Sequence, residues 1–381
     1  MVATDGNKHA PIKDHFKRNI ETRYRDMDTS YKPWPAAGVK DRDAWRAAID
    51  ELKPGDAITI FTPDSTHFPI AAYALQKKIH VLVTKPAAQK LDEHLELLKI
   101  AKEASKGGQE VLCYVEHHKR FDPAYLDAKE KAASGQLGFP SFFQSYMSQP
   151  KTQLETFKAW AGVDSDISYY LNSHHVDVFA WMAKGQARPV KVTASASSGI
   201  AESLGCKPGT EDTITLLVDW EILPQGSDSE AQPVPGQRAT SVFTASWSAP
   251  KGAGVHSEQG FHYVGSKGEA RVNQSRRGYE VTTEEGADPG YKSLNPFYVQ
   301  YAPLDGYFQP HGYGVRSIEI FVQACTAINS GKRRASEYDD FLPTLADTVS
   351  TTAILHAGRI SLDEKRSVGI QTGSDGLPTL V

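Results

Sequence analysis

The chain has 381 residues, of which 40% are hydrophobic and 23% are charged, and its formal net charge is −4. This size and composition are typical of a globular protein with about two domains. The lack of a basic excess argues against nucleic acid as a partner. No apolar run approaches the roughly 20 residues of a membrane helix, and residues 1–12 lack the apolar segment of a secretion signal.

The three cysteines, Cys113, Cys206 and Cys325, are far apart in the sequence and form no CxxC pair. An odd and sparse set of cysteines is typical of a protein from a reducing compartment. We therefore expect a cytoplasmic protein that binds a small molecule and has neither a nucleic-acid nor a membrane partner.

Residues 57–115 alternate between short β-branched runs and longer segments with helical spacing. Such an alternation predicts a parallel sheet with helices on both faces, as in a doubly wound Rossmann-type sheet. The expected strands are residues 57–61, 80–83 and 110–115, and the expected helices are residues 66–77 and 91–104.

Beyond residue 118 the strands become longer, and apolar residues alternate with polar ones. Within residues 240–248, Phe243, Ala245 and Trp247 fall on one face of the strand. This spacing predicts an antiparallel sheet with one covered face. The expected strands are residues 141–147, 190–196, 213–220 and 240–248, and the expected helices are residues 122–134, 317–329 and 342–360.

The predicted fold class is therefore α/β, with an incomplete Rossmann-type doubly wound parallel sheet followed by an α+β domain. We assign residues 1–118 to a Rossmann-like dinucleotide-binding domain. Residues 119–381 are assigned to a substrate and oligomerisation domain with a large, open, mainly antiparallel sheet. Because an uncovered sheet face favours self-association, we expect a homo-oligomer. Residues 223–238, rich in Pro, Gly, Ser and Gln, are expected to form a surface loop.

Polar loops follow the three parallel strands, at residues 62–67, 84–86 and 116–121. Folds of this kind bind ligands in a crevice at the carboxyl ends of their strands. Pro63 and Pro86 restrict the backbone as it leaves the first two strands. Together the three loops predict a binding site.

Four segments resemble motifs of the glucose–fructose oxidoreductase/inositol dehydrogenase/rhizopine-catabolism (Gfo/Idh/MocA) family. HVLVTKP resembles HVLVEKP, with Thr84 in place of Glu, and TPDSTHFPIAAYAL resembles TPNxxHxxxAxxAL. VEHHKRFDPAYLDAKEKAASGQLG resembles VGHNRRFDPAYxxAKxxIxxGxLG, and SHHVDVFAWM is similar to GxHxxDxxRWL. Four matches in the same order form a specific signal, and the likeness covers most of the chain after about residue 42.

This resemblance implies an oxidoreductase that uses NAD or NADP on a sugar, a polyol or a sugar acid. Lys85 matches the active-site lysine of the family and His174 matches its catalytic histidine. Oxidation of an alcohol needs a proton transfer alongside the hydride transfer, and an imidazole suits that task near neutral pH. Where the family often has a carboxylate and a glycine ahead of this histidine, the chain has Tyr170 and Asn172. Tyr170 could then supply a phenol for proton relay.

Two further sets of residues follow from the loop positions and from the resemblance. The lysine, arginine and histidine side chains among the expected substrate-binding residues favour a uronic acid of the galacturonate type as the substrate. The expected cofactor-binding residues are Asp5, Thr62, Pro63, Asp64, His67, Thr84, Lys85 and Pro86. The expected substrate-binding residues are Lys85, His117, Arg120, Trp160, Asn172, His174 and Asp177.

The GxGxxG turn that binds a pyrophosphate has no counterpart in residues 1–60, which contain only Gly6, Gly38 and Gly55. Two later glycine pairs, at residues 252–254 and 312–314, are wrongly placed for this role. Residues 1–20 look like the end of a second strand, an Asp5-Gly6 turn and the helix that follows. The first strand, glycine turn and helix are thus expected to be absent, which favours a truncated or mis-started product over a domain that has lost cofactor binding.

Other functions remain open at this point. The chain could be a non-catalytic regulator that binds a sugar or a nucleotide, or an NAD-dependent glycosidase. The histidine pairs at residues 117–118 and 174–175 raise the possibility of zinc. Adjacent residues point to different faces, however, so each pair would offer at most one ligand, and we expect no metal.

Overall fold

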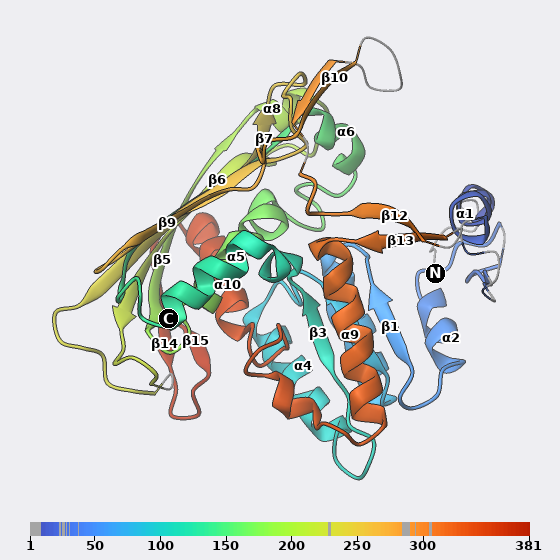
Figure 1. The fold of residues 1–381 in the computed structure, drawn as a ribbon, viewed down its shortest axis with the longest axis horizontal. Helices are drawn as coiled ribbons and strands as arrows, with labels where there is room; N and C mark the ends of the chain where they lie inside the picture. Colours follow the sequence, from blue (N-terminus) through green and yellow to red (C-terminus); the bar gives the residue numbers. More distant parts are fainter. Residues whose placement is uncertain are drawn as a thin grey trace.

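The computed structural model describes residues 9–22, 24, 27, 29, 31–36, 38–227, 230–283, 290–293, 295–304 and 307–381. Within this part of the chain, a three-stranded sheet and an eight-stranded sheet are joined by helices, and two separate hairpins lie beside them (Figure 1). This arrangement confirms the predicted α/β class, with a Rossmann-like sheet followed by a large, mainly antiparallel one.

The three-stranded sheet is parallel, with the order β1-β2-β3. Its strands are β1 (Ala57–Ile60), β2 (His80–Thr84) and β3 (Cys113–Glu116). Thr84, the last residue of β2, pairs in register with Glu116, the last residue of β3. The third strand begins later than expected, at Cys113, because the N–H of Leu112 bonds to the His80 imidazole at 3.0 Å.

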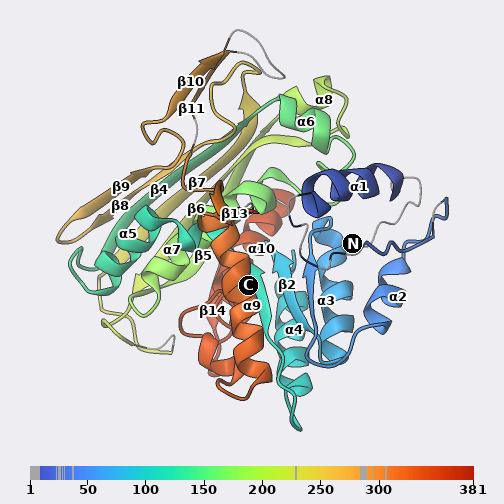
Figure 2. The same ribbon diagram turned by 45° about the vertical axis from the view of Figure 1, so that its right-hand side comes forward.

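Helices cover both faces of this sheet (Figure 2). Helices α3 (His67–Gln76) and α4 (Leu91–Ala104) share a core with Val81 and Val83. On the other face, Leu82 and Tyr114 pack against α9 (Tyr313–Asn329), which returns from late in the chain. Helix α9 packs on the first sheet although it comes from the part of the chain assigned to the second domain. The domain boundary at residue 118 therefore stays a prediction.

The eight-stranded sheet has the order β15-β14-β5-β6-β7-β4-β8-β9. Only β4 and β7 are parallel neighbours, and the other pairs are antiparallel. The strands are β4 (Pro140–Pro150), β5 (Ala187–Ser198), β6 (Glu211–Ile222), β7 (Arg238–Ala249), β8 (Glu258–Gly265), β9 (Glu269–Asn273), β14 (Val368–Thr372) and β15 (Pro378–Leu380).

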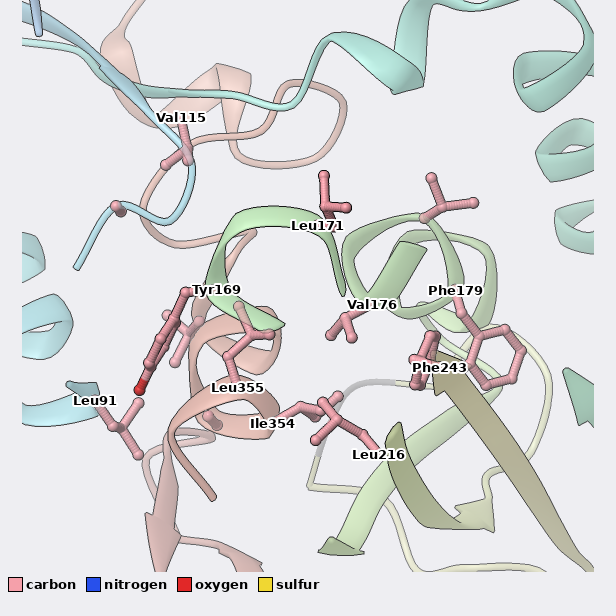
Figure 3. Close-up of a cluster of buried hydrophobic side chains, with 14 of the residues drawn as sticks. Leu91, Val115, Tyr169, Leu171, Val176, Phe179, Leu216, Phe243, Ile354 and Leu355 are labelled. Carbon is pink, nitrogen blue, oxygen red and sulfur yellow. The ribbon is translucent and has the colours of Figure 1, made fainter. Parts of the chain in front are cut away.

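One face of the large sheet is covered by α5 (Pro123–Ala133), α7 (Ser173–Ala183) and α10 (Val349–Glu364). In this core, the Phe179 ring of α7 lies 4.6 Å from Phe143 and 4.8 Å from Trp220. Figure 3 shows side chains of α7, α10 and the sheet meeting in the same core. Side chains such as Tyr146 and Leu217 are exposed at 45% and 43%. The single covered face is therefore confirmed.

Helix α10 was expected from residue 342, but it begins only at Val349. The preceding residues instead lie along β3, where the N–H of Val115 bonds to the carbonyl of Pro343 at 2.7 Å and Thr344 forms a bridge with Tyr114. A segment that pairs with a strand edge cannot also be helical, so this contact delays the helix.

The remaining elements are shorter. Residues 223–237 connect β6 and β7 as a loop wherever they are described, and Arg238, the last residue of the expected loop, already belongs to β7. Asp5 lies outside the described residues. Among the described helices, none combines the length and the hydropathy that a membrane span requires. The shorter α-helices are α1 (His9–Phe16), α2 (Ala44–Asp50), α6 (Thr152–Phe157) and α8 (Ile200–Ser203), and the 3-10 or π-helical turns are η2 (Lys17–Glu21), η3 (Asp64–Thr66), η4 (His118–Phe121), η5 (Ser168–Asn172) and η6 (Ala335–Tyr338). The two hairpins are β10 (Glu280–Thr283) with β11 (Gly290–Ser293) and β12 (Gln300–Leu304) with β13 (Tyr307–His311).

Candidate functional site

The loops after β2 and β3 meet η5 and the start of α7, and the loop after β1 meets the segment just ahead of η5. Lys85, which follows β2, donates a hydrogen bond to the backbone carbonyl of Tyr170, and its ammonium lies 4.6 Å from the centre of the Tyr170 ring. Tyr170 belongs to the π-helical turn η5, which leads directly into α7 and His174. The structure therefore brings Lys85 and His174 into one cluster between the two sheets.

The His67 ring holds the first two loops together. Its Nδ1 lies 2.8 Å from the carbonyl oxygen of Pro86, and its Nε2 lies 2.9 Å from that of Thr62. The ring is fully buried. His67 thus fixes the backbone of the loops that carry Pro63 and Lys85, and its own ring faces no open space.

The side-chain ammonium group of Lys85 lies in a largely buried environment. Burial lowers the pKa of Lys85 to about 8, although the carboxylates of Asp64 and Glu116 oppose the shift. Asp64 is itself buried, accepts a hydrogen bond from Ser165 and has a pKa raised mainly by burial. Among the described residues Lys85 forms no ion pair within 4 Å, so its charge is available to a ligand.

His174 lies in the first turn of α7 and is 7% exposed. Its Nδ1 is buried and has no hydrogen-bond partner within the described part of the chain. Burial holds the pKa of His174 well below its usual value, and the positive charges of Lys85 and Lys119 lower that pKa further. An imidazole in such surroundings is neutral near pH 7.

In each of the two histidine pairs, one ring lies at the site and the other ring points into the interior of the protein. The centres of the His118 and His174 rings are 5.1 Å apart. Their neighbours turn away, since His175 lies 2.9 Å from the hydroxyl of Tyr125, and His117 is only 2% exposed. Within the described residues, no group of three or more His, Cys, Asp or Glu side chains could hold a metal ion.

Sequence reasoning missed His118 and Lys119 as site residues. His118 Nδ1 lies 3.0 Å from a carboxylate oxygen of Glu116, and Lys119 donates hydrogen bonds to the side-chain oxygens of Gln259 and Gln274. Burial lowers the pKa of Lys119 to about 7. The sequence did contain a signal for these two residues. Within the family motif VGHNRRF, positions 116, 118 and 119 are the ones at which this chain has a different residue.

Aromatic rings line the side of the site formed by η5. The Tyr170 ring lies 5.4 Å from Trp160 and 5.1 Å from Phe157. Asp166 fixes the start of this turn by accepting the N–H groups of Ser168 and Tyr169 at 2.8 and 2.9 Å. Burial raises the pKa of Tyr170, so its phenol stays protonated.

Two other predicted site residues use their side chains within the protein. Asn172 is 2% exposed and donates to the Ser168 hydroxyl at 3.0 Å and to the Ile214 carbonyl at 3.2 Å. Thr84 donates to the Ile60 carbonyl at 3.2 Å. Both residues therefore support the walls of the site.

A buried ion network lies beneath the site. Both oxygens of Asp177 accept hydrogen bonds from the Arg120 guanidinium, at 2.7 and 2.8 Å, and the same guanidinium donates to Asp347. Arg120 and Asp177 are 4% and 0% exposed, and His117 Nδ1 lies 3.5 Å from Asp177. Arg120 and Asp177, both expected to bind substrate, are thus engaged with each other, and the network ties the loop after β3 to α7.

The residues present fit the nicotinamide end of a dinucleotide. Buried polar atoms without partners among the described residues, Gln149 Oε1 and His174 Nδ1, leave hydrogen-bonding capacity beside Tyr170 and Lys85. The loops at residues 62–67 and 84–86 form the adjoining wall. A glycine-rich turn for the pyrophosphate is not found among residues 1–60.

A cavity of about 270 Å³ lies elsewhere, at the amino end of β3. It is bordered by α4 and by the segment from Arg334 to Ala346, with Lys102, Glu110 and Arg334 at its walls. Because ligands of parallel α/β sheets bind at the carboxyl ends of the strands, the residues around Lys85, and not this cavity, are the candidate site.

The fold and the site define a class of proteins, the oxidoreductases in which a Rossmann-type sheet is followed by a large sheet domain. Residues 35–110 match the profile described as "Oxidoreductase family, NAD-binding Rossmann fold", and residues 125–271 match the "GFO/IDH/MocA C-terminal domain". The chain belongs to the Gfo/Idh/MocA oxidoreductase family, which confirms the resemblance in its motifs.

Curated relatives match part of the chain. The scyllo-inositol 2-dehydrogenase (NAD(+)) of Bacillus subtilis (strain 168) is 33% identical over 180 residues, which cover 45% of this chain and 48% of that protein. The uncharacterized oxidoreductase YdgJ of Escherichia coli (strain K12) is 34% identical over 123 residues, covering 32% and 34%. The chain thus spans about a third to a half of the length of these relatives.

Solved structures share the fold over nearly the whole chain. The myo-inositol 2-dehydrogenase from Lactobacillus plantarum has a TM-score of 0.63 at 19% identity and covers 97% of this chain and 90% of its own. GenD2 from gentamicin A biosynthesis, solved in complex with NAD, has a TM-score of 0.66 at 19% identity, with coverages of 97% and 88%.

The Asp177→Asn variant tests whether the Arg120 network is structural. It removes a buried charge partner and leaves Arg120 with Asp347 alone, so we expect the free energy of unfolding to fall by about 3 kcal/mol. Urea denaturation measures the change. The control is Asp219→Asn, which breaks the surface pair with Lys191 and is expected to cost under about 1 kcal/mol. Equal losses in the two variants would contradict the assignment.

Proposed function

We propose that this protein is an NAD(P)-dependent oxidoreductase that acts on a CH–OH group of a sugar, a polyol or a sugar acid. The observation that carries the proposal is the gathering of Lys85, His174 and His118 at the carboxyl edge of a Rossmann-type sheet. A bound nicotinamide would supply the hydride chemistry, and the protein would supply orientation and electric field.

Lys85 and His174 would border the reacting oxygen of the substrate. As a cation in a dry environment, Lys85 stabilises the negative charge that develops on this oxygen during hydride transfer. His174 is neutral and offers a second hydrogen-bonding group. Tyr170 anchors the Lys85 ammonium through its carbonyl and its ring. The loops that contain Thr62, Asp64 and Pro86 would hold the nicotinamide end of the cofactor.

Titration with NAD⁺ and NADP⁺, followed by assays at 340 nm over a panel of inositols, aldoses and uronic acids, tests the proposal. We expect binding tighter than about millimolar and turnover of at least one polyol or sugar. Cofactor binding without turnover would favour a regulatory family member instead. Release of a leaving group without net reduction of the nicotinamide would favour a glycosidase. Absence of cofactor binding would contradict both enzyme readings.

The charge of Lys85 predicts a pH dependence. Because the pKa of Lys85 is about 8, we expect kcat/KM to fall as pH rises through 8 and the lysine loses its proton. Lys85→Met is expected to lower kcat/KM by about 10²-fold or more. Lys99→Met, on the exposed side of α4, is the control and should have no effect. A pH profile that stays flat from pH 7 to pH 10 would contradict this role.

The same lysine gives a check that needs no turnover. The pKa is lower in the folded state than the value of 10.5 typical of an exposed lysine, so the buried cation destabilises the native state below pH 8. As pH rises from 8 to 10.5, the wild type should gain stability relative to Lys85→Met. Thermal unfolding at several pH values measures this gain.

A uronic acid of the galacturonate type is the finer proposal for the substrate. Neither Lys85 nor Lys119 forms an ion pair with a described carboxylate, so their charge can attract the carboxylate of a substrate. Arg120, expected to share this role, is engaged with Asp177 and Asp347. The support therefore comes from the two lysines.

Lys119→Met tests the finer proposal. We expect the KM for D-galacturonate to rise by about tenfold, while the KM for the neutral sugar D-galactose changes little. Steady-state kinetics with both compounds make the comparison within one variant. An equal rise for both substrates would show that Lys119 supports the fold of the site and does not select a carboxylate.

Self-association through the uncovered face of the large sheet stays a prediction. The exposed Tyr146 and Leu217 on this sheet are consistent with it.

A further inference from the structure

Glu116 and His118 form a carboxylate–imidazole dyad inside the site. Glu116 ends β3 and is 8% exposed. One of its oxygens lies 3.0 Å from His118 Nδ1, and the other accepts a hydrogen bond from the hydroxyl of Ser317 at 2.8 Å. The carboxylate is thus held from two sides, by the loop after β3 and by α9. A carboxylate fixed in this way also fixes the orientation of the imidazole.

The His118 ring is aimed at the space next to His174. It is stacked on Tyr313 at 5.9 Å with an interplanar angle of 15°, and the Tyr298 ring lies 5.7 Å away. The other ring nitrogen, Nε2, has no hydrogen bond to any described residue, and 18% of the side chain is exposed. With Nδ1–H donating to Glu116, Nε2 carries the lone pair and can accept a proton.

His174 lacks such a partner. No described carboxylate bonds to His174, whose surroundings of Lys85 and Lys119 oppose a further positive charge. The position four residues earlier, where the family motif often supplies a carboxylate, is Tyr170. The complete dyad is therefore found at the end of β3 and in the loop after it, at two positions that the motif VGHNRRF fills with Gly and Asn.

The carboxylate of the dyad also acts on the charge of Lys85. Glu116 is the register partner of Thr84, the residue that stands where the motif HVLVEKP has Glu. A carboxylate missing from the end of β2 is thus present at the neighbouring end of β3. Its charge favours the protonated form of Lys85. One carboxylate thereby supports both the cation at the reacting oxygen and the imidazole beside it.

We propose that His118 is the acid–base residue of the site and that Glu116 is its positioning residue. This inference rests on the proposed function. In the oxidation of an alcohol, the C–H bond breaks and its electron pair leaves as hydride to an oxidised nicotinamide. The O–H proton goes to His118 Nε2, and the electrons of that bond form the C=O double bond. The reverse sequence reduces a carbonyl. His174 donates or accepts a hydrogen bond at the same oxygen and keeps its protonation state.

Kinetics of His118→Asn and Glu116→Gln test the assignment. His118→Asn restores the motif residue and should lower kcat by about 10²-fold or more, with KM changed much less, because a general base acts in the transition state. Glu116→Gln keeps a hydrogen-bond acceptor and should cause a smaller loss. In His118→Gly, added imidazole should restore part of kcat, which a purely structural residue would not allow.

His262→Asn is the matched control. His262 forms the same kind of dyad with Glu269, at 2.8 Å, but on the large sheet away from the site. Its replacement should leave kcat unchanged. Full kcat in His118→Asn, together with a loss of kcat in His174→Asn, would assign the proton transfer to His174 and overturn the proposal.

A chemical readout separates this inference from the proposed function. Diethylpyrocarbonate modifies accessible neutral imidazoles, and peptide mass spectrometry locates the modified residue. We expect His118 to react faster than His174, and Glu116→Gln to slow the reaction at His118 but not at His262. This pattern in a protein without turnover would keep the dyad and reject the oxidoreductase function. Faster reaction at His174 would overturn the dyad whether or not turnover is seen.

Discussion

The buried contact between Arg120 and Asp177 is the constraint on which the site depends. Arg120 belongs to the loop after β3, Asp177 belongs to α7, and Asp347 joins them from the segment ahead of α10. A charge removed from water needs partners of this quality, and a guanidinium with two carboxylates leaves little freedom in the relative position of the three segments. Because His118 and His174 lie on two of these segments, their separation is set by the ion network beneath them.

Two lysine side chains border the space above this network. Lys85 and Lys119 reach it with lowered pKa values of about 8 and about 7. Each of the two lysines is held by neutral oxygen atoms of the protein. A site that keeps cations in a dry environment favours ligands and transition states in which negative charge gathers on oxygen.

Much of the fold could be predicted from the sequence, because the apolar spacing of its elements is local. Helix α4 matches its predicted bounds, Leu91 to Ala104. The late start of α10 could not be predicted, since it depends on pairing between Pro343 and a strand more than two hundred residues earlier. Loop positions and motifs pointed to Lys85 and His174. The burial of Arg120 could not be foreseen, because its partner Asp347 is 227 positions away and a charged loop residue carries no local sign of such a partner.

The placement of α9 has a consequence for how the chain is made. Leu82 and Tyr114 are synthesised early, but the helix that shields them from water, through Phe321, leaves the ribosome about two hundred residues later. Until then the first sheet has one bare apolar face and an unpaired edge at β3. Such surfaces recruit chaperones or neighbouring chains during translation. The parallel sheet is therefore encoded first, but its second face is covered only late in synthesis, when α9 has emerged.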